Sequence, residues 1–185
     1  MHDIDHHSHW SAEDLSDAEQ DRLISEYYAR RRSDQVDFAF VHPRVATGGA
    51  IASKRDVRIL RAAGITAIAT MADELHDETR RHVAGNVPLL LNGICDDGRC
   101  QPADWFARTV AFAREVLTDP DAKIYVHCAA GINRGPSGAY AVLRALGDTP
   151  SQARARIEQA RPITRLGLAY AGCADTAIKV LGLAA

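Results

Sequence analysis

Short apolar segments alternate with segments of helical periodicity along most of this 185-residue chain, and this alternation constrains the fold more than any other feature. The segments at 65–70, 87–91 and 123–127 have the composition and length of buried strands. One helical segment, at 53–63, precedes them, and another, from Pro102 onward, separates the last two. Because parallel strands need helical crossovers, the pattern predicts a single α/β domain with a central, mainly parallel sheet flanked by helices on both faces.

The ends of the predicted elements carry local signals. Ser53 and Asp56 cap the helix at 53–63, and Gly64 ends it where a positive φ costs least. Thr149 and Gln152 open another helix in the same way. The remaining predicted elements are a strand at 36–41, a turn at 45–50, and helices at 134–146, 149–160 and 168–181.

The first 35 residues differ in composition from the rest. Residues 1–10 are polar and rich in histidine, and we interpret them as a flexible tail rather than a metal site. Residues 11–35 are expected to form a helical extension, since Ser11 and Asp14 make a capping signature before an apolar stripe. The sequence therefore predicts one domain over 36–185, preceded by a tail and a helix.

The composition excludes several kinds of partner. With 22 basic and 24 acidic side chains the net charge is −2, which argues against nucleic acid or an anionic membrane surface held by bulk electrostatics. No apolar run approaches the ~20 residues of a membrane span, and the N-terminus does not resemble a secretory signal. The four cysteines are scattered without metal-binding spacing, so we expect them to be reduced and the protein to be cytoplasmic.

The segment VHCAAGINRGPS at 126–137 is the strongest functional signal. Cys128 follows a predicted strand, and a loop of small residues separates it from Arg134 at a helix start. Inward backbone N–H groups, the helix N-terminus and the arginine fork all favour a bound dianion, and they favour the thiolate of Cys128. We therefore predict that Cys128 is a nucleophile. The predicted phosphate-binding residues are Ala129, Ala130, Gly131, Ile132, Asn133 and Arg134.

The string HCAAGINR resembles the signature loop of the cysteine-dependent protein phosphatases, in their dual-specificity branch. ATGGA, GITAIATM, WF and ARPITR resemble that branch in order and spacing, between about residues 38 and 182. Cys128, Gly131 and Arg134 match the family's nucleophile, turn and phosphate clamp. The resemblance implies a phosphatase-like catalytic domain over 36–185 that hydrolyses phosphomonoesters in two steps, through a cysteinyl-phosphate, with no metal or other cofactor.

The substrates implied by the resemblance are phosphotyrosine, phosphoserine or phosphothreonine in proteins, and small phosphate esters. The loop interior contains no lysine, whereas phosphatases that act on inositol lipids tend to carry basic residues there. A lipid headgroup is therefore disfavoured. The oligomeric state is left open by the sequence.

The leaving oxygen of such a reaction needs a proton donor. The family carries an aspartate on a mobile loop upstream of the cysteine, and GICDDGRCQP offers Asp96 and Asp97 here. The spacing to Cys128 favours Asp96. An aspartate followed by glycine favours Asp97, and DDG resembles the acid loop of the phosphatases of regenerating liver. We prefer Asp97 by a narrow margin.

Gly135 departs from the family pattern, which usually has a Ser or Thr hydroxyl at this position to bond the departing thiolate. This departure keeps open a second interpretation, a pseudophosphatase that binds phosphorylated partners. A third is an arsenate reductase or a rhodanese-like enzyme, but the rhodanese loop is shorter and the two aspartates would have no role. Cys95 and Cys100 lie near the predicted acid loop and are candidates for a protective disulfide with Cys128.

Overall fold

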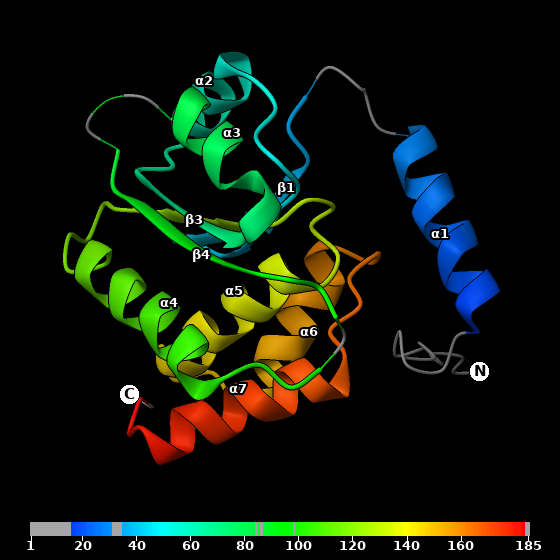
Figure 1. The fold of residues 1–185 in the computed structure, drawn as a ribbon, viewed down its shortest axis with the longest axis vertical. Coiled ribbons are helices and arrows are strands. Elements are labelled where there is room, and N and C mark those ends of the chain that lie inside the picture. The colour runs from blue at the N-terminus through cyan, green and yellow to red at the C-terminus, as the bar shows by residue number, and fades with distance from the viewer. Residues whose placement is uncertain (1–15, 31–34, 84, 86, 98, 184–185) are drawn as a thin grey trace, which may run out of the picture.

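The structure, a computed structural model, describes residues 16–30, 35–83, 85, 87–97 and 99–183. The strands are β1 (Phe38–His42), β2 (Val45–Gly48), β3 (Ala67–Ala72), β4 (Leu89–Ile94) and β5 (Ile124–His127). They form one sheet in the order β1-β2-β5-β3-β4 (Figure 1). β1 and β2 pair antiparallel, and the other neighbouring strands pair parallel. The sheet is therefore mainly parallel, as predicted.

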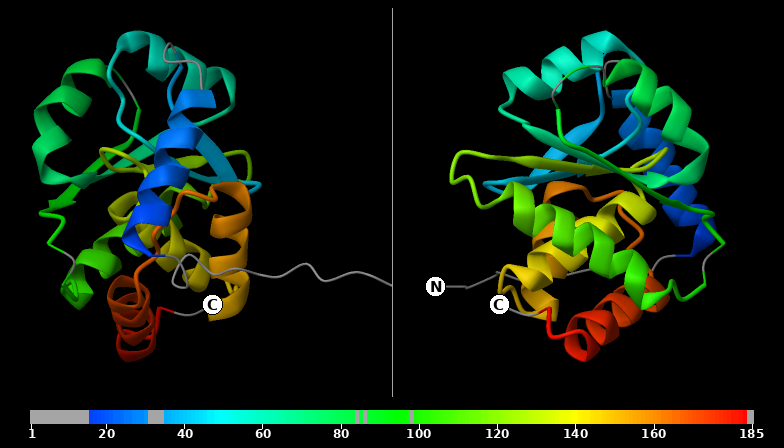
Figure 2. Two further views of the ribbon diagram at one scale, coloured as in Figure 1. Left: turned by 90° about the vertical axis from the view of Figure 1, so that its right-hand side faces the viewer. Right: turned by 60° about the vertical axis from the view of Figure 1, so that its left-hand side comes forward.

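Helices cover both faces of this sheet (Figure 2). They are α1 (Asp17–Arg30), α2 (Lys54–Ala62), α3 (His76–His82), α4 (Ala103–Val116), α5 (Arg134–Ala145), α6 (Pro150–Ala160) and α7 (Leu168–Val180). α2 and α3 lie on one face, and α4 to α7 lie on the other. α1 stands outside these layers, and its Asp21 forms an ion pair with Arg165 at 2.8 Å. The predicted fold class is confirmed.

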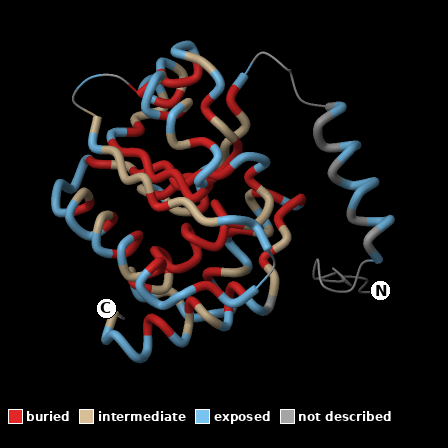
Figure 3. The backbone as a smooth tube through the Cα atoms, in the orientation of Figure 1, coloured by how far each residue is buried: buried red, intermediate tan, exposed pale blue. Residues whose placement is uncertain are grey.

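The sheet separates two apolar cores, and β5 contributes to both. Ile124 and Val126 point into the larger core with α4, α5 and α7, whereas Tyr125 between them points into the smaller core with α2. All residues of β5 are buried, and the strands at the centre of Figure 3 are mostly buried as well. A strand buried on both faces explains the short apolar run at 124–126.

Two parts of the predicted secondary structure are wrong or incomplete. The sequence predicts a turn that includes residues 45–48, but they form β2, because they pair with β1 on one side and β5 on the other. The turn of 3₁₀ helix at Asp73–Leu75 and the short α3 are not predicted, since their residues are mostly acidic or basic and show no apolar periodicity. The predicted caps at Ser53 and Thr149 are both present.

The N-terminal predictions are only partly covered by the structure. Residues 1–15 lie outside the described residues, so the histidine-rich tail and the capping signature of Ser11 and Asp14 are not addressed. The predicted helix is present from Asp17 to Arg30. Among the described residues, no helix is long and apolar enough to cross a bilayer.

Candidate active site

The loop at residues 128–133 leaves the carboxyl end of the central strand β5 and enters α5 at Arg134. His127, the last residue of β5, pairs with Gly48 of β2 and Thr70 of β3, so strands flank the loop on both sides. Cys128 is buried, and its N–H donates to the carbonyl of Gly48 at 3.3 Å. The sheet thus fixes the backbone of the predicted nucleophile.

The loop carbonyls are held from outside the loop. Ala129 O accepts a hydrogen bond from Ala50 N, and Ile132 O accepts one from Arg165 N, both at 2.9 Å. Gly131 O accepts one from Arg161 Nε at 3.2 Å. In a planar trans peptide the carbonyl and the next N–H point in opposite directions. The N–H groups that follow these carbonyls therefore turn toward the other side of the loop, which is the geometry of an anion-binding nest.

Gly131 is required by two features of this loop. Its φ is +67°, a conformation that side chains other than glycine rarely adopt. A Cβ atom there would also lie 2.4 Å from the carbonyl carbon of Gly48. The loop can therefore pack against β2 only with glycine at this position.

Arg161 anchors the same loop through its side chain. This side chain is fully buried, and its guanidinium donates to both carboxylate oxygens of Asp37, at 2.8 and 3.0 Å, as well as to Gly131 O. In the sequence this residue belongs only to a string that resembles the family. In the structure it forms a buried ion pair that ties the loop to the residue just before β1.

Arg134 is buried and held by acidic groups. It donates to both carboxylate oxygens of Glu74, at 2.7 and 2.5 Å, and to Ile94 O at 2.8 Å. Hydrogen bonds from Arg134 lower the pKa of Glu74 to about 2. Burial disfavours the guanidinium charge, but the bonds to Glu74 and the charge interactions with Cys128, Glu74 and Asp96 together outweigh it and raise the pKa of Arg134. Its Nε is buried and donates no hydrogen bond to a described residue, although an Asp96 oxygen lies 3.3 Å away.

Glu74 was not anticipated from the sequence. It lies in the polar string ADELHDE, which carries no catalytic motif and reads as a solvated loop. Its position directly after β3 is the one usable signal, because β3 neighbours β5 and residues beyond the carboxyl ends of adjacent parallel strands meet at one edge.

The two candidate acids lie in different surroundings. Asp96 Oδ1 accepts hydrogen bonds from Asn133 Nδ2 at 2.8 Å and Tyr170 Oη at 3.1 Å, so this carboxylate lies against the phosphate loop. Asp97 Oδ1 instead accepts from Arg99 N at 3.0 Å and Gln101 Nε2 at 3.1 Å, within its own loop. The structure brings Asp96, not Asp97, together with Arg134. The narrow preference for Asp97 has no support in these contacts.

His127 is fully buried directly before Cys128. Its Nε2 lies 2.9 Å from Thr70 Oγ1, its Nδ1 lies 3.4 Å from Cys128 O, and its ring stacks on Tyr125 at 5.1 Å. Burial lowers the pKa of His127 to about 4. The imidazole is therefore neutral at pH 7 and supports the strand end through hydrogen bonds rather than through charge.

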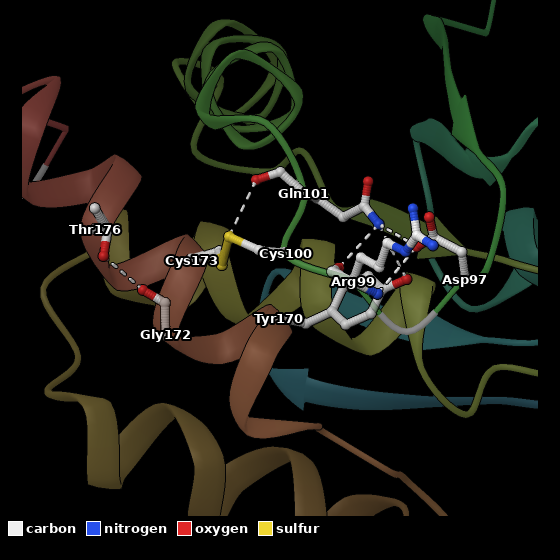
Figure 4. Close-up of a disulfide and its surroundings, with 8 residues drawn as sticks. All are labelled: Asp97, Arg99, Cys100, Gln101, Tyr170, Gly172, Cys173 and Thr176. Atoms are coloured by element: carbon white, nitrogen blue, oxygen red, sulfur yellow. Dashed lines mark hydrogen bonds between the residues drawn. A yellow bond between two sulfur atoms is a disulfide. The ribbon is translucent and has the colours of Figure 1, made fainter.

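The cysteines correct two expectations. Cys100 and Cys173 form a disulfide, with 5.8 Å between their Cα atoms (Figure 4), so the four cysteines are not all reduced. Cys100 is thereby unavailable to Cys128, and Cys95 and Cys128 are both free. The partner of Cys100 is 73 residues away in the chain, and nothing in the sequence indicated that pair.

A pocket of about 370 Å³ adjoins the phosphate loop. The carboxylate of Asp96, the amide of Asn133 and the guanidinium of Arg165 supply its polar edges, and Tyr170 forms part of its wall. Ala130, Ile132 and Asn133 of the 128–133 loop form one side of this pocket. Within the described part of the chain, no group of three or more His, Cys, Asp or Glu side chains could hold a metal ion.

Gly135 allows α5 to start close to Cys128. A Cβ atom at this position would lie 2.9 Å from Cys128 N and 3.1 Å from His127 C, both of them backbone atoms. Ser137, two residues later, is buried and donates to Asn133 O at 2.8 Å, so its hydroxyl faces back into the helix start. Close packing against the backbone of residues 127 and 128 therefore accounts for the glycine at residue 135, and a glycine has no hydroxyl.

Comparisons with known proteins establish the fold. No family model and no curated protein sequence matches the chain. PTPMT1 in complex with PI(5)P matches with a TM-score of 0.67 at 18% identity, over 78% of this chain and 96% of that chain. Human DUSP28 matches with 0.66 at 19%, over 78% and 95%. The human tyrosine phosphatase-like serine/threonine/tyrosine-interacting protein matches with 0.64 at 20%, over 80% and 99%.

These likenesses and the site define the class of structure. The chain has the fold of the dual-specificity and protein tyrosine phosphatases, as its signature loop predicts. At such low identities the likeness concerns the fold.

Proposed function

We propose that residues 36–185 form a cysteine-dependent phosphatase domain that hydrolyses phosphomonoesters, with Cys128 as nucleophile and residues 129–134 as the phosphate site. The observation that carries this proposal is the convergence of three separate segments. Cys128 and the loop come from the end of β5, Arg134 opens α5, and Asp96 reaches the loop from the β4–α4 connection. This set supplies a nucleophile, an anion clamp and a proton donor within one site.

In the proposed reaction the Cys128 thiolate attacks phosphorus while the loop N–H groups and Arg134 hold the phosphoryl oxygens. The ester oxygen leaves and takes a proton from the carboxylic acid of Asp96. Water then attacks the cysteinyl-phosphate and gives a proton to the Asp96 carboxylate, and the Cys128 thiolate departs. Asp96 takes this role on the strength of its contacts with Asn133 and Arg134, with Asp97 as the alternative to be excluded.

The proposed substrates are phosphotyrosine and, secondarily, phosphoserine or phosphothreonine in proteins. The pocket beside the loop supports this choice, because Ala130, Ile132 and Ala169 give it an apolar lining that suits an aryl ring. PTPMT1 matches this fold in a complex with PI(5)P, but the loop here lacks lysine. The cytoplasmic location remains a prediction. The Cys100–Cys173 disulfide counts against it, because disulfides are rare in cytosolic proteins.

A second candidate function is capture of phosphorylated partners without efficient turnover. Gly135 favours it, since the departing thiolate lacks a hydroxyl partner and a side chain at this position would contact the backbone of Cys128. One fold match is named a phosphatase-like interacting protein. The two functions differ in turnover and agree in phosphate binding.

The test is hydrolysis of p-nitrophenyl phosphate without added metal, together with binding of vanadate. Wild type should turn over, Cys128→Ser should bind vanadate without turnover, and Arg134→Ala should lose both, because only the thiolate attacks and the guanidinium holds the anion. Vanadate binding with no turnover by wild type would favour the capture function. Turnover that survives Cys128→Ser would refute the nucleophile.

A further inference from the structure

Tyr170 of α7 contacts the proposed proton donor directly. Its hydroxyl donates to Asp96 Oδ1 at 3.1 Å and accepts from Gln101 Nε2 at 3.3 Å. The ring is buried, and it packs edge-on against Trp105 of α4 with 6.4 Å between the ring centroids. Two helices therefore fix the hydroxyl, whereas the carboxylate it contacts sits on a loop and is partly exposed.

A disulfide joins the two segments at the point where Gln101 meets Tyr170. Cys100 directly precedes Gln101, and Cys173 lies about one helical turn after Tyr170 (Figure 4). The figure shows the side chains of Gln101 and Tyr170 extending to the same side of this link, where they meet. The covalent bond thus limits how far the loop that carries Asp96 can move from α7.

We infer that Tyr170 is a positioning residue for proton transfer by Asp96, and that the Cys100–Cys173 disulfide keeps the loop that carries Asp96 in position next to Tyr170. This inference rests on the proposed phosphatase activity. Arg134 alone would draw Asp96 toward the site where phosphate binds, since its Nε lies 3.3 Å from Asp96 Oδ2. Tyr170, together with Asn133, holds the other oxygen toward the pocket that receives the leaving group, which Asp96 and Tyr170 both line.

The tyrosine hydroxyl keeps this role at neutral pH. Burial, together with the neighbouring Asp96 charge, raises the pKa of Tyr170 to about 12. The hydroxyl therefore retains its proton and remains a donor throughout the range in which a phosphatase would work. A phenylalanine at this position preserves the ring packing on Trp105 and removes only the hydrogen bonds.

The experiment compares two esters that differ in their need for an acid. Phenyl phosphate has a poor leaving group that requires protonation, whereas p-nitrophenyl phosphate requires it little. Tyr170→Phe should lower kcat on phenyl phosphate about tenfold, the loss expected for one hydrogen bond to a charged group. On p-nitrophenyl phosphate the change should stay within about twofold. A loss of the same size on both esters would overturn the inference.

A double-mutant cycle with Asp96→Asn separates positioning from a general structural effect. If Tyr170 acts through Asp96, adding Tyr170→Phe to Asp96→Asn should cost no further activity on phenyl phosphate. Full multiplication of the two losses would contradict the inference. The matched control is Tyr140→Phe, because Tyr140 is also buried and donates to a carboxylate on α7, that of Asp175 at 2.8 Å, outside the site. Tyr140→Phe should leave the ratio of the two rates unchanged.

The disulfide is tested in the variant Cys100→Ser/Cys173→Ser, which avoids a reductant that would also affect Cys128. It should show the same selective loss on phenyl phosphate, and it provides the test if Tyr170→Phe fails to fold. A double-serine variant with wild-type rates on both esters would refute the disulfide's part. A wild type active on both esters with no selective loss in Tyr170→Phe refutes only this inference. A wild type inactive on both refutes the proposed function and the inference with it.

Discussion

Gly135→Ala introduces a single methyl group at the closest approach of α5 to the end of β5. The new Cβ would lie 2.9 Å from Cys128 N and 3.1 Å from His127 C, and neither backbone atom can rotate away. Relief requires α5 or the Cys128 peptide to shift. Overpacking of this kind costs about 1–3 kcal/mol, which offsets the ~0.5–1 kcal/mol that alanine gains over glycine in a helix.

The stability change can be measured by thermal unfolding. For a chain of 185 residues, a net loss of up to ~2.5 kcal/mol lowers Tm by up to about 10 °C. Because the backbone of Cys128 is displaced, kcat on p-nitrophenyl phosphate should fall about tenfold or more. The same contact means that Gly135→Ser, which would supply the family's usual hydroxyl, should not accelerate turnover.

Gly172→Ala is the matched control. Gly172 lies on α7, and apart from its chain neighbours and the backbone of its own helix, no described atom would lie within 4 Å of its Cβ. This variant should be more stable than wild type by about 0.5–1 kcal/mol and equally active. If Gly135→Ala melts at or above the wild-type temperature with unchanged kinetics, the packing explanation of Gly135 is refuted.

Three further predictions concern charged groups and rings near the loop. The pKa of Glu74 is about 2 against an ordinary 4.5, so the folded state loses stability as pH falls from about 4.5 to about 2, and Glu74→Gln should flatten Tm across that window. The pKa of His127 is about 4 in the folded protein against an ordinary 6.5, so on acidification the unfolded state binds a proton first. The free energy of unfolding therefore falls as pH drops from about 6.5 to about 4. His127→Asn should reduce this slope, and an unchanged slope would contradict the burial argument. Asp37→Ala removes the carboxylate that faces the fully buried Arg161 and should cost about 3–5 kcal/mol in urea unfolding, whereas a cost below about 1 kcal/mol would mean that the pair does not anchor the loop.

The fold could be predicted because its signals are local or periodic. The apolar run at 124–126 and the caps at Ser53 and Thr149 each specify an element without knowledge of distant contacts. β2 was missed for the opposite reason. Val45–Gly48 becomes a strand only through its partners β1 and β5, and its glycine otherwise favours a turn.

The site residues also fall into those that are contiguous in the sequence and those that come from distant segments. The loop from Cys128 to Arg134 is contiguous in the sequence, so its pattern identifies it. Glu74 and Tyr170 reach it from distant segments, and neither sits in a motif. The choice between Asp96 and Asp97 also depended on a contact that sequence spacing does not encode, the bond from Asn133. Covalent pairing of Cys100 with Cys173 is equally non-local.

The most direct test of the proposed chemistry is to trap phosphate on the protein during the first turnover. Wild type is mixed with an excess of ³²P-labelled phenyl phosphate, quenched in acid within milliseconds, digested and mapped. Because Gly135 offers no hydroxyl to the departing thiolate, the intermediate should accumulate and the label should approach about one phosphate per chain, on the peptide that holds Cys128. Turnover with no label on that peptide, or equal labelling of Cys128→Ser, would contradict a cysteinyl-phosphate mechanism.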